Sequence, residues 1–217
     1  MSSALGGLTP SESSPLRLAV GSAAPGAEKV LAAALDLFHA KGYGGTTVRE
    51  IASVAGVTVA AVYYHFDSKQ TILATLMTRA MHRALAQVSS AHAIADQNDP
   101  LARLRAIVDA HVRFNCTHQV EAFVGNSELR SLEGENRSQV VALRDAHEAM
   151  FRSVVCDGLA AGVFKTQHPE ESVRAILAMS TAVAGWFKQT GSLTIDRVAR
   201  EYVYISLMVL GCPDAEN

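Results

Sequence analysis

The chain has 217 residues, of which 49% are hydrophobic and 18% are charged, and its formal net charge at pH 7 is −2. A chain of this length and apolar content can bury a sizeable core in one large domain or in two smaller ones. The charge balance excludes a strongly basic or acidic chain, but it is compatible with a local patch that binds nucleic acid.

Three cysteines, Cys116, Cys156 and Cys212, are present, and no two of them have the CxxC spacing. An odd number without that spacing argues against a disulfide framework or a structural zinc site, and indicates the reducing cytoplasm. No apolar run reaches the roughly 18 uninterrupted residues of a membrane span, and segment 173–187 is predicted to be a buried helix. The N-terminus lacks the basic and apolar blocks of a secretion signal, so we expect a cytoplasmic protein without a membrane partner.

Residues 1–25 are rich in serine, glycine and proline. Such a segment cannot bury enough surface to offset the entropy of ordering it, so we expect a disordered N-terminal arm. From Ala27 onward, apolar residues recur at the three- and four-residue spacing of a helix, which first stops at Gly42.

Two short helices are predicted next. Thr47 and Glu50 have the spacing of a capping box at the start of the first helix, which ends at Gly56. Thr58 caps the second helix, which runs to about His65. Two short helices joined by a tight turn with glycine form the helix-turn-helix pattern, in which the second helix enters the major groove of DNA. Similar helix pairs occur in proteins that do not bind DNA, so the pattern alone leaves both interpretations open.

The rest of the chain has the same helical spacing, and its sequence contains no alternating strand pattern and no internal repeat. Further helices are predicted over residues 68–93, 99–118, 121–132, 136–161, 169–189 and 194–210. The fold class is therefore all-α, with about nine helices. We predict a helix-turn-helix domain over residues 26–74 and a larger helical domain over residues 75–217.

The outward face of the second short helix supports a role in DNA binding. Val59, Val62 and Phe66 share one face and are predicted to pack on the first helix, whereas Ala60, Ala61 and Tyr64 face away. Alanines let a helix approach the base edges in the major groove, which is about 12 Å wide. Tyrosine hydroxyls at the rim can donate to phosphates, as can backbone N–H groups at helix starts. The competing interpretation is that the tyrosines fill a small core.

The stretch "TTVREIASVAGVTVAAVYYHFDSKQTIL", with the preceding "ALDLFHAKGYGGTT", resembles the DNA-binding domain of the TetR family of transcriptional repressors. The paired threonines, the "AGV" turn, the "YYHF" end and the lysine three residues after the phenylalanine carry this resemblance, which covers about residues 27–75. It implies a homodimer whose N-terminal domains read DNA and whose C-terminal bodies hold a ligand pocket and the dimer interface. The DNA contacts that it implies are Thr47, Thr58, Val59, Ala60, Ala61, Tyr63, Tyr64, His65 and Lys69.

The chain departs from the family pattern at two positions. Val59 stands where many relatives have lysine or glutamine, and Ala61 stands where they have threonine or asparagine. Few direct hydrogen-bond readers remain, so methyl contacts, Arg49 or the shape of the DNA are expected to supply the sequence specificity.

The same resemblance implies an effector pocket within residues 75–217. The candidate lining residues are the large apolar side chains Phe114, Phe123, Met150, Phe151 and Trp186 and the polar side chains His111, Asn115, Asn126, Arg130 and Arg144. Large apolar residues at helical spacing usually form an ordinary core, and polar residues can simply be solvated, so both alternatives stay open.

Two later stretches, "ELRSLEGENRSQVVALRDAHEAMFRSVV" and "AVAGWFKQTG", resemble the C-terminal domains of TetR-type regulators of lipid and sterol catabolism. Those regulators sense acyl-CoA or similar apolar acids. The resemblance implies a small hydrophobic effector that releases the protein from a palindromic operator and whose anionic head group meets Arg130, Arg137 or Arg144. The alternative is a multidrug-type regulator that senses cationic or aromatic drugs.

Segments 170–189 and 194–210 are the predicted dimer helices, because small residues such as Ala178, Ala182 and Gly185 allow close helix approach. The alternative is that these helices bury the same face within one chain.

An enzyme is not expected. The sequence contains no Gly-rich phosphate loop, nucleophile elbow or HExxH motif, and His111, Cys116 and His118 lack a zinc-binding spacing. We therefore predict no catalytic residues, no metal and no cofactor, and we keep a helical binding module without DNA as a less favoured alternative.

Overall fold

The computed structural model describes residues 24–212, and within this range it contains nine α-helices, one short 3-10 helix and no β-strand. The elements are α1 (Pro25–Lys41), α2 (Val48–Ala55), α3 (Val59–His65), α4 (Lys69–Ile94), α5 (Pro100–Thr117), α6 (Gln119–Ser127), η1 (Leu129–Ser131), α7 (Gly134–Ala160), α8 (Pro169–Trp186) and α9 (Ile195–Val209). The predicted all-α fold is confirmed. The predicted arm at 1–25 lies outside the described residues apart from Ala24 and Pro25, and Pro25 already begins α1.

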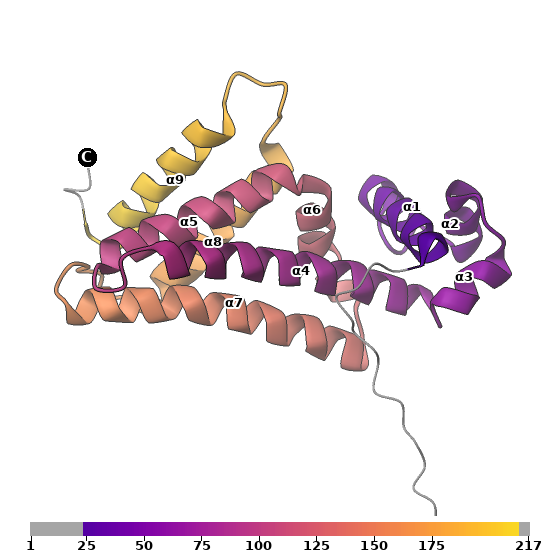
Figure 1. Ribbon diagram of the computed structural model, residues 1–217, viewed down its shortest axis with the longest axis horizontal. Coiled ribbons are helices and arrows are strands. Elements are labelled where there is room, and N and C mark those ends of the chain that lie inside the picture. The colour runs from indigo at the N-terminus through magenta and orange to yellow at the C-terminus, as the bar shows by residue number, and fades with distance from the viewer. Residues whose placement is uncertain (1–23, 213–217) are drawn as a thin grey trace, which may run out of the picture.

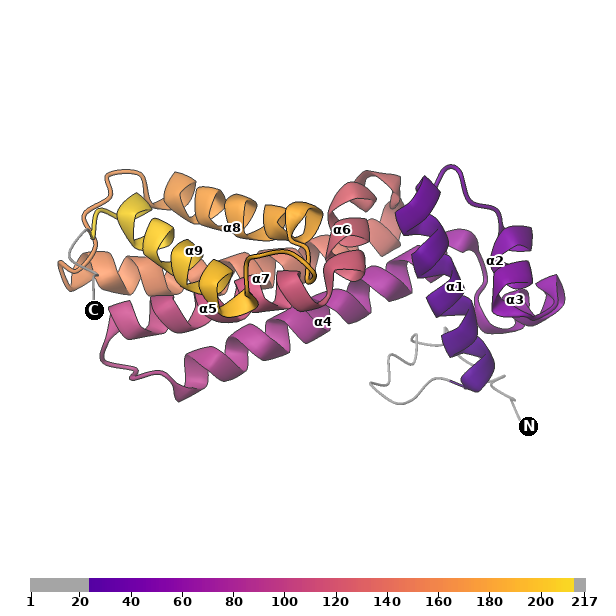
Figure 2. The same cartoon turned by 90° about the horizontal axis from the view of Figure 1, so that it is seen from above.

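The helices form two units that share one long helix (Figures 1 and 2). α1, α2 and α3 form a small unit at one end of the elongated molecule, and α5 to α9 form a larger bundle. α4 starts beside α3 and runs on along the bundle, so the predicted domain boundary near residue 74 falls inside a continuous helix. In the part of the chain that the structure describes, no helix combines the length and the apolarity needed to cross a membrane.

The apolar core of the small unit continues into the bundle. Ile51 of α2, Val62 of α3 and Leu73 of α4 are at most 1% exposed and belong to one cluster. The same cluster includes Val124 of α6 and Val140 of α7. Because these contacts cross from one unit to the other, the small unit is packed against the bundle as well as joined to it by α4.

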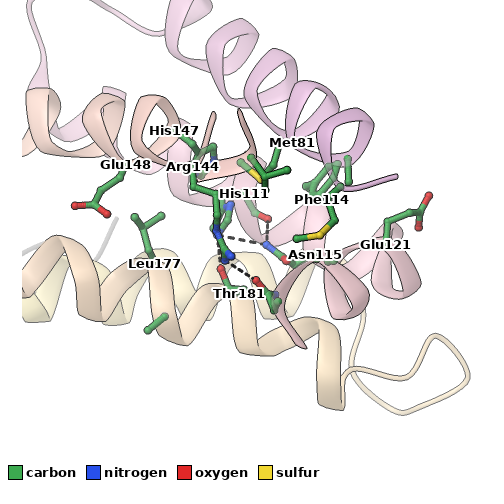
Figure 3. Close-up of a pocket in the computed structure, with 17 residues that line it drawn as sticks. Met81, His111, Phe114, Asn115, Glu121, Arg144, His147, Glu148, Leu177 and Thr181 are labelled. Carbon is green, nitrogen blue, oxygen red and sulfur yellow. Dashed lines mark hydrogen bonds between the residues drawn. The ribbon is translucent and has the colours of Figure 1, made fainter. Parts of the chain in front are cut away.

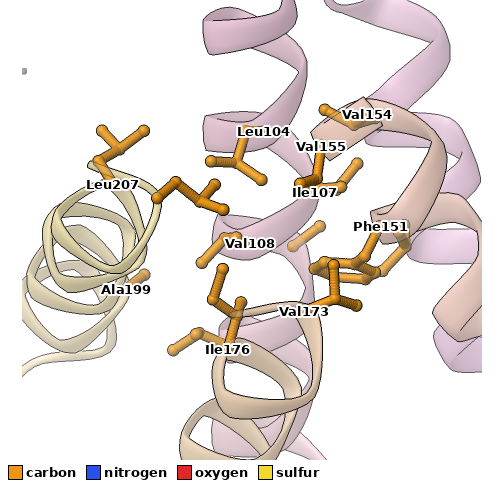
Figure 4. Close-up of a cluster of buried hydrophobic side chains, with 14 of the residues drawn as sticks. Leu104, Ile107, Val108, Phe151, Val154, Val155, Val173, Ile176, Ala199 and Leu207 are labelled. Atoms are coloured by element: carbon orange, nitrogen blue, oxygen red, sulfur yellow. The ribbon is translucent and has the colours of Figure 1, made fainter. Parts of the chain in front are cut away.

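The bundle is organised around α5 (Figure 4). Ile107 and Val108 of α5 are completely buried and pack in one cluster with Phe151 of α7, Ile176 of α8 and Leu207 of α9. Burying a side chain of this size contributes about 1.5–3 kcal/mol. This core holds α5, α7 and α8 in fixed positions, and all three helices also line the cavity described below.

One predicted helix is interrupted in the structure. The sequence predicts a single helix over 121–132, whereas α6 ends at Ser127 and is followed by η1. Glu128, which separates the two, is 9% exposed, and its carboxylate accepts a hydrogen bond from Ser131 Oγ at 2.8 Å. Because a buried carboxylate needs a polar partner, this bond favours a tight turn over a continued helix.

Candidate nucleic-acid interface and effector cavity

The turn between α2 and α3 is fixed by local hydrogen bonds. Thr47 caps α2 through a complete capping box with Glu50, and the Lys41 ammonium and the Thr47 backbone N–H lower the pKa of that carboxyl to about 2. Gly56 ends α2 in the left-handed region with φ 67°, which glycine adopts at low cost. Thr58 then caps α3 by accepting a hydrogen bond from the Ala61 N–H at 3.1 Å. These bonds hold α3 at a defined angle to α2, as the predicted helix-turn-helix requires.

α3 has one buried face and one open face. Val62 and Phe66, the residue just after the end of α3, are 1% and 7% exposed and anchor the helix in the core of the small unit. Val59 was predicted to share this buried face, but it lies at the start of the helix and is 37% exposed. Tyr64 is 85% exposed and Tyr63 is 52% exposed, with the exposed Ala60 one turn earlier. α3 also lies at the far end of the molecule from the bundle, where a duplex can approach it (Figure 1).

His65 and Lys69 differ from their neighbours because both make contacts within the protein. The His65 ring lies against α1, since a Cβ placed on Gly26 would be 2.8 Å from His65 Nε2. Lys69 Nζ donates to the carbonyl oxygens of Tyr43 and Thr46 at 2.8 and 2.7 Å, and lies 4.0 Å from the centre of the Tyr43 ring. The two Lys69 hydrogen bonds connect the start of α4 to the turn that precedes α2.

A cavity of about 270 Å³ lies in the bundle between α4, α5, α6, α7 and α8 (Figure 3). Met77 and Met81 of α4, Phe114 of α5 and Leu177 of α8 make much of its wall apolar. Methionine side chains adapt to ligands of different shape. A concave apolar site with a few placed polar groups is the usual architecture for binding a small molecule.

The polar part of the wall centres on two histidines from different helices. His111 of α5 and His147 of α7 are 7% and 6% exposed, and their ring centres are 4.9 Å apart. Burial lowers the pKa of His111 well below its ordinary value. Burial, with a further contribution from the charge of Arg144, lowers the pKa of His147 to about 4. Both imidazoles are therefore neutral at pH 7.

Arg144 is the cation of the cavity wall. It reaches from α7 to α6, where its Nη2 donates to Asn126 Oδ1 at 2.8 Å, and Asn126 is exposed. Burial lowers the pKa of Arg144, but a guanidinium stays charged at neutral pH. Among the residues that the structure describes, no carboxylate forms an ion pair with Arg144.

The two carboxylates of the cavity wall already have cationic partners. Glu121 pairs with Arg83 at 3.4 Å, and Glu148 pairs with Arg152 one turn further along α7. Arg152 also pairs with Glu170, at 2.9 Å. The site therefore offers a ligand one guanidinium without a carboxylate partner among the described residues and two carboxylates that already have arginine partners, which suits an anionic ligand better than a cationic one.

Two family models match the chain, one over each unit. The model of the bacterial regulatory proteins of the tetR family matches residues 30–76. The model of the tetracyclin repressor-like C-terminal domain matches residues 97–210, which is more than half of the chain. The chain belongs to the tetR family. It is therefore a transcriptional regulator with a helix-turn-helix DNA-binding domain, as the resemblance implies.

Individual tetR-family proteins are similar along most of the chain. The repressor KstR2 of Rhodococcus jostii is 26% identical over 187 residues, which cover 85% of this chain and 91% of that protein. A tetR-family regulatory protein from Rhodococcus RHA1 is 31% identical, with a TM-score of 0.81 and coverage of 88% of this chain and 99% of its own. A solved structure of AibR with isovaleryl coenzyme A and operator DNA has the same fold, with a TM-score of 0.76, 24% identity and coverage of 87% and 98%.

The predicted DNA contacts of this tetR-family chain gather at the helix-turn-helix. The exposed members of the set are Thr47, Arg49, Thr58, Val59, Ala60, Tyr63 and Tyr64, and Ala61 is partly exposed. His65 and Lys69 are partly exposed and engaged within the protein, so their role toward DNA stays a prediction.

Five of the predicted effector residues line the cavity, and five do not. The residues in the wall are His111, Phe114, Asn115, Asn126 and Arg144. The other five are Phe123, Arg130, Met150, Phe151 and Trp186.

Each residue outside the wall has a contact or position that explains its place. Phe151 is 1% exposed in the bundle core, and Met150 packs against that core. Phe123 meets His39 of α1 edge-on, with ring centres 5.1 Å apart. Trp186 is 43% exposed and stacks on Tyr202 at 6.3 Å, while Arg130 is exposed in η1, so neither points into the cavity.

Sequence reasoning missed His147, Glu121 and the α4 methionines of the wall. His147 lies on the same face of α7 as Val140 and Arg144. Two polar side chains beside a buried valine on one helical face could have indicated the cavity wall. No pattern in the sequence marked Met77 and Met81. The first turns of α4 pack in the small unit, and how far along α4 the side chains begin to line the cavity depends on how the helices pack.

Proposed function

We propose that this protein is a ligand-responsive transcriptional repressor that binds a palindromic operator as a homodimer and is released by a small acyl effector. The observation that carries the proposal is the continuity of α4: its first residues adjoin α3, and Met77, Ala80 and Met81 line the cavity. A ligand that moves this helix therefore changes the position of α3.

The proposed dimer interface is the outer face of α8 and α9. Small exposed residues outside the cavity wall, Ala182 and Gly185, lie along α8, and large exposed apolar residues, Ile205 and Met208, lie along α9. Ile205 and Met208 are 41% and 49% exposed, and Tyr204, one turn before Met208, is 36% exposed. Adjacent exposed apolar side chains of this kind mark an interaction surface. Two such faces related by a two-fold axis would form a four-helix bundle.

The proposed coupling between cavity and DNA also uses α6 and η1. α6 contributes Gly125 and Asn126 to the cavity wall, while Phe123 on the same helix contacts His39 of α1. At the end of η1, the Ser131 carbonyl accepts a hydrogen bond from Gln70 Nε2 of α4 at 2.6 Å. A shift of α6 on ligand binding would therefore move both contacts. The distance between the two α3 helices of the dimer would then no longer match the roughly 34–36 Å between adjacent major grooves.

Arg144 supports an acyl-CoA or a related organic acid as the effector. The guanidinium lacks a carboxylate partner among the described residues and lies beside the exposed Asn126, where the anionic part of a ligand would enter. Relatives are consistent with this chemistry, since AibR was solved with isovaleryl coenzyme A and operator DNA. A drug-like cation is disfavoured because Glu121 and Glu148 are already paired with arginines.

The proposal is tested by a gel-shift assay with DNA upstream of the protein's own coding region. We expect a discrete complex that short-chain acyl-CoAs dissociate and free coenzyme A does not. A helical binding module without DNA function would show no complex at any protein concentration. Release by aromatic cations alone would favour the multidrug-type alternative.

A further inference from the structure

The floor of the cavity holds a histidine whose ring has one satisfied and one unsatisfied nitrogen. His111 Nε2 lies 3.2 Å from Thr181 Oγ1 and 3.3 Å from Asn115 Nδ2, and the same amide nitrogen donates to the His111 carbonyl oxygen at 2.9 Å (Figure 3). Because an amide nitrogen only donates, Nε2 acts as the acceptor and the proton of the neutral ring is on Nδ1. That N–H group is buried and has no hydrogen-bond partner among the described residues.

A second unmatched nitrogen lies beside it. His147 Nε2 is also buried without a partner in the described part of the chain, and its ring lies 4.9 Å from the His111 ring. Both residues belong to the cavity wall. A buried polar group without a partner is costly to keep, and two of them on one cavity wall call for a partner from outside the protein.

We propose that the effector carries a carbonyl or hydroxyl oxygen on the part of its acyl group that reaches the floor of the cavity, where His111 and His147 bind it. This inference rests on the proposed function, because it assigns the inner end of the same effector whose anionic part meets Arg144. The rest of the acyl group lies against the apolar wall around Met77, Met81 and Leu177.

Size and charge limit the ligand further. The cavity volume of about 270 Å³ is just below the roughly 300–1,000 Å³ of sites for drug-sized ligands, so a short acyl group fits while the nucleotide of coenzyme A stays outside. A carboxylate on the acyl group at the floor of the cavity is disfavoured, because both imidazoles there are neutral and buried. A neutral oxo or hydroxy group satisfies an N–H donor without bringing a charge into the core.

Matched ligand pairs test the inference with the intact protein. Isothermal titration would compare 4-oxopentanoyl-CoA with 4-methylpentanoyl-CoA, and 5-oxohexanoyl-CoA with 5-methylhexanoyl-CoA. Within each pair a methyl group and a hydrogen replace the carbonyl oxygen, and the two pairs place that oxygen at different depths. We expect the wild type to prefer at least one oxo compound over its methyl partner by about tenfold, since a site built to pair with an oxygen rejects the analogue that lacks it.

Variants identify the groups responsible. His111→Phe and His147→Phe keep a ring but remove its nitrogens, and at least one of them is expected to abolish or invert the preference. His82→Phe, the same change at an exposed position of α4 outside the cavity wall, is the matched control and should retain it. Circular dichroism checks the fold of each variant, and if one histidine variant does not fold, the other carries the test.

Each outcome of the titrations has a distinct meaning. Equal or tighter binding of both methyl compounds by the wild type would overturn the oxygen inference and leave the acyl effector standing. A preference that survives in every folded histidine variant would also overturn it. If no acyl-CoA binds although the operator is bound, the proposed effector class fails, and the inference fails with it.

Discussion

The outer face of α3 and the cavity of the bundle are built in opposite ways. α3 is seven residues long, and its function follows from consecutive positions: buried Val62 and Phe66 hold it, while exposed Tyr63 and Tyr64 flank small alanines. The cavity takes its wall from five helices, and its polar groups come from positions far apart in the chain. The comparison shows that the exposed face of α3 depends on neighbouring positions of one helix, whereas the cavity depends on how distant helices pack.

The largest expected effect breaks the DNA surface alone. Ala60→Glu places a longer, negatively charged side chain on the exposed face of α3, where it would meet the bases and phosphates of the groove. We expect operator affinity to fall about hundredfold or more, because like charges brought together at an interface cost several kcal/mol. The melting temperature should be unchanged, and effector binding should be retained.

The control for this variant is Ala86→Glu, the same change at an exposed position of α4 outside the cavity wall. Equal loss of operator affinity in both variants would show that added charge, rather than the position of α3, is responsible. Fluorescence anisotropy with a labelled operator measures both affinities.

The next prediction concerns a variant that changes the cavity and leaves the helix-turn-helix intact. Arg144→Gln removes the guanidinium and keeps a polar side chain, so we expect acyl-CoA affinity to fall about tenfold to hundredfold, as for the loss of a charge-assisted hydrogen bond. Arg137→Gln changes the other candidate arginine of the same helix, which is exposed and outside the cavity wall, and this variant should bind as the wild type does. Equal losses in the two variants would assign the effect to overall charge. Isothermal titration gives both constants.

The histidines predict how the stability of the bundle depends on pH. An unfolded histidine is protonated near its ordinary pKa of 6.5, whereas folded His147 stays neutral down to about 4. The unfolded state therefore binds the extra proton over this range, and the stabilisation present above pH 6.5 is lost as pH falls. We expect about 1 kcal/mol less free energy of unfolding per pH unit from this residue.

Denaturant titrations from pH 7 to pH 5 measure this dependence. His147→Phe should show a shallower pH dependence than the wild type over the same interval. Superimposable profiles would contradict the buried neutral state of this ring. His111, whose pKa burial also lowers, should add a contribution in the same direction.

The smallest expected effects distinguish contacts with DNA from contacts within the protein near the end of α3. The resemblance implies that Lys69 contacts a phosphate, and Lys69→Met would then make the salt dependence of operator binding shallower by about one unit of slope. Lys69 Nζ instead donates to two carbonyl oxygens within the protein, so we expect the variant to lose about 1 kcal/mol of stability and to keep the slope unchanged.

Tyr63→Phe is the counterpart, because it removes an exposed hydroxyl and should weaken operator binding about threefold without changing the melting temperature.

The fold could be predicted from the sequence to different depths in the two regions. The capping threonines, the glycine at the end of α2 and the spacing of Val62 and Phe66 are local signals, and each has the role that local physics assigns to it. The break between α6 and η1 was not predictable in this way, because it depends on a buried carboxylate at Glu128 whose surroundings come from elsewhere in the chain.

The cavity shows the same limit. His111 and Asn115 were identifiable as polar residues on an apolar helix face, and both line the wall. Phe151 and Trp186 carry the same kind of signal as Phe114, yet one lies in the core and the other stacks on Tyr202. Helical periodicity tells which side of a helix is covered, but not whether the cover is another helix or a space for ligand.

The central claim is that one chain couples the cavity to α3, and the most direct measurement is release of a labelled upstream operator fragment by acyl-CoA, followed by fluorescence anisotropy. We predict that wild type and Arg144→Gln bind the fragment equally, that acyl-CoA releases the wild type, and that the variant stays bound at the same effector concentration. Equal release of both proteins, or acyl-CoA binding that leaves the operator complex intact, would contradict the account.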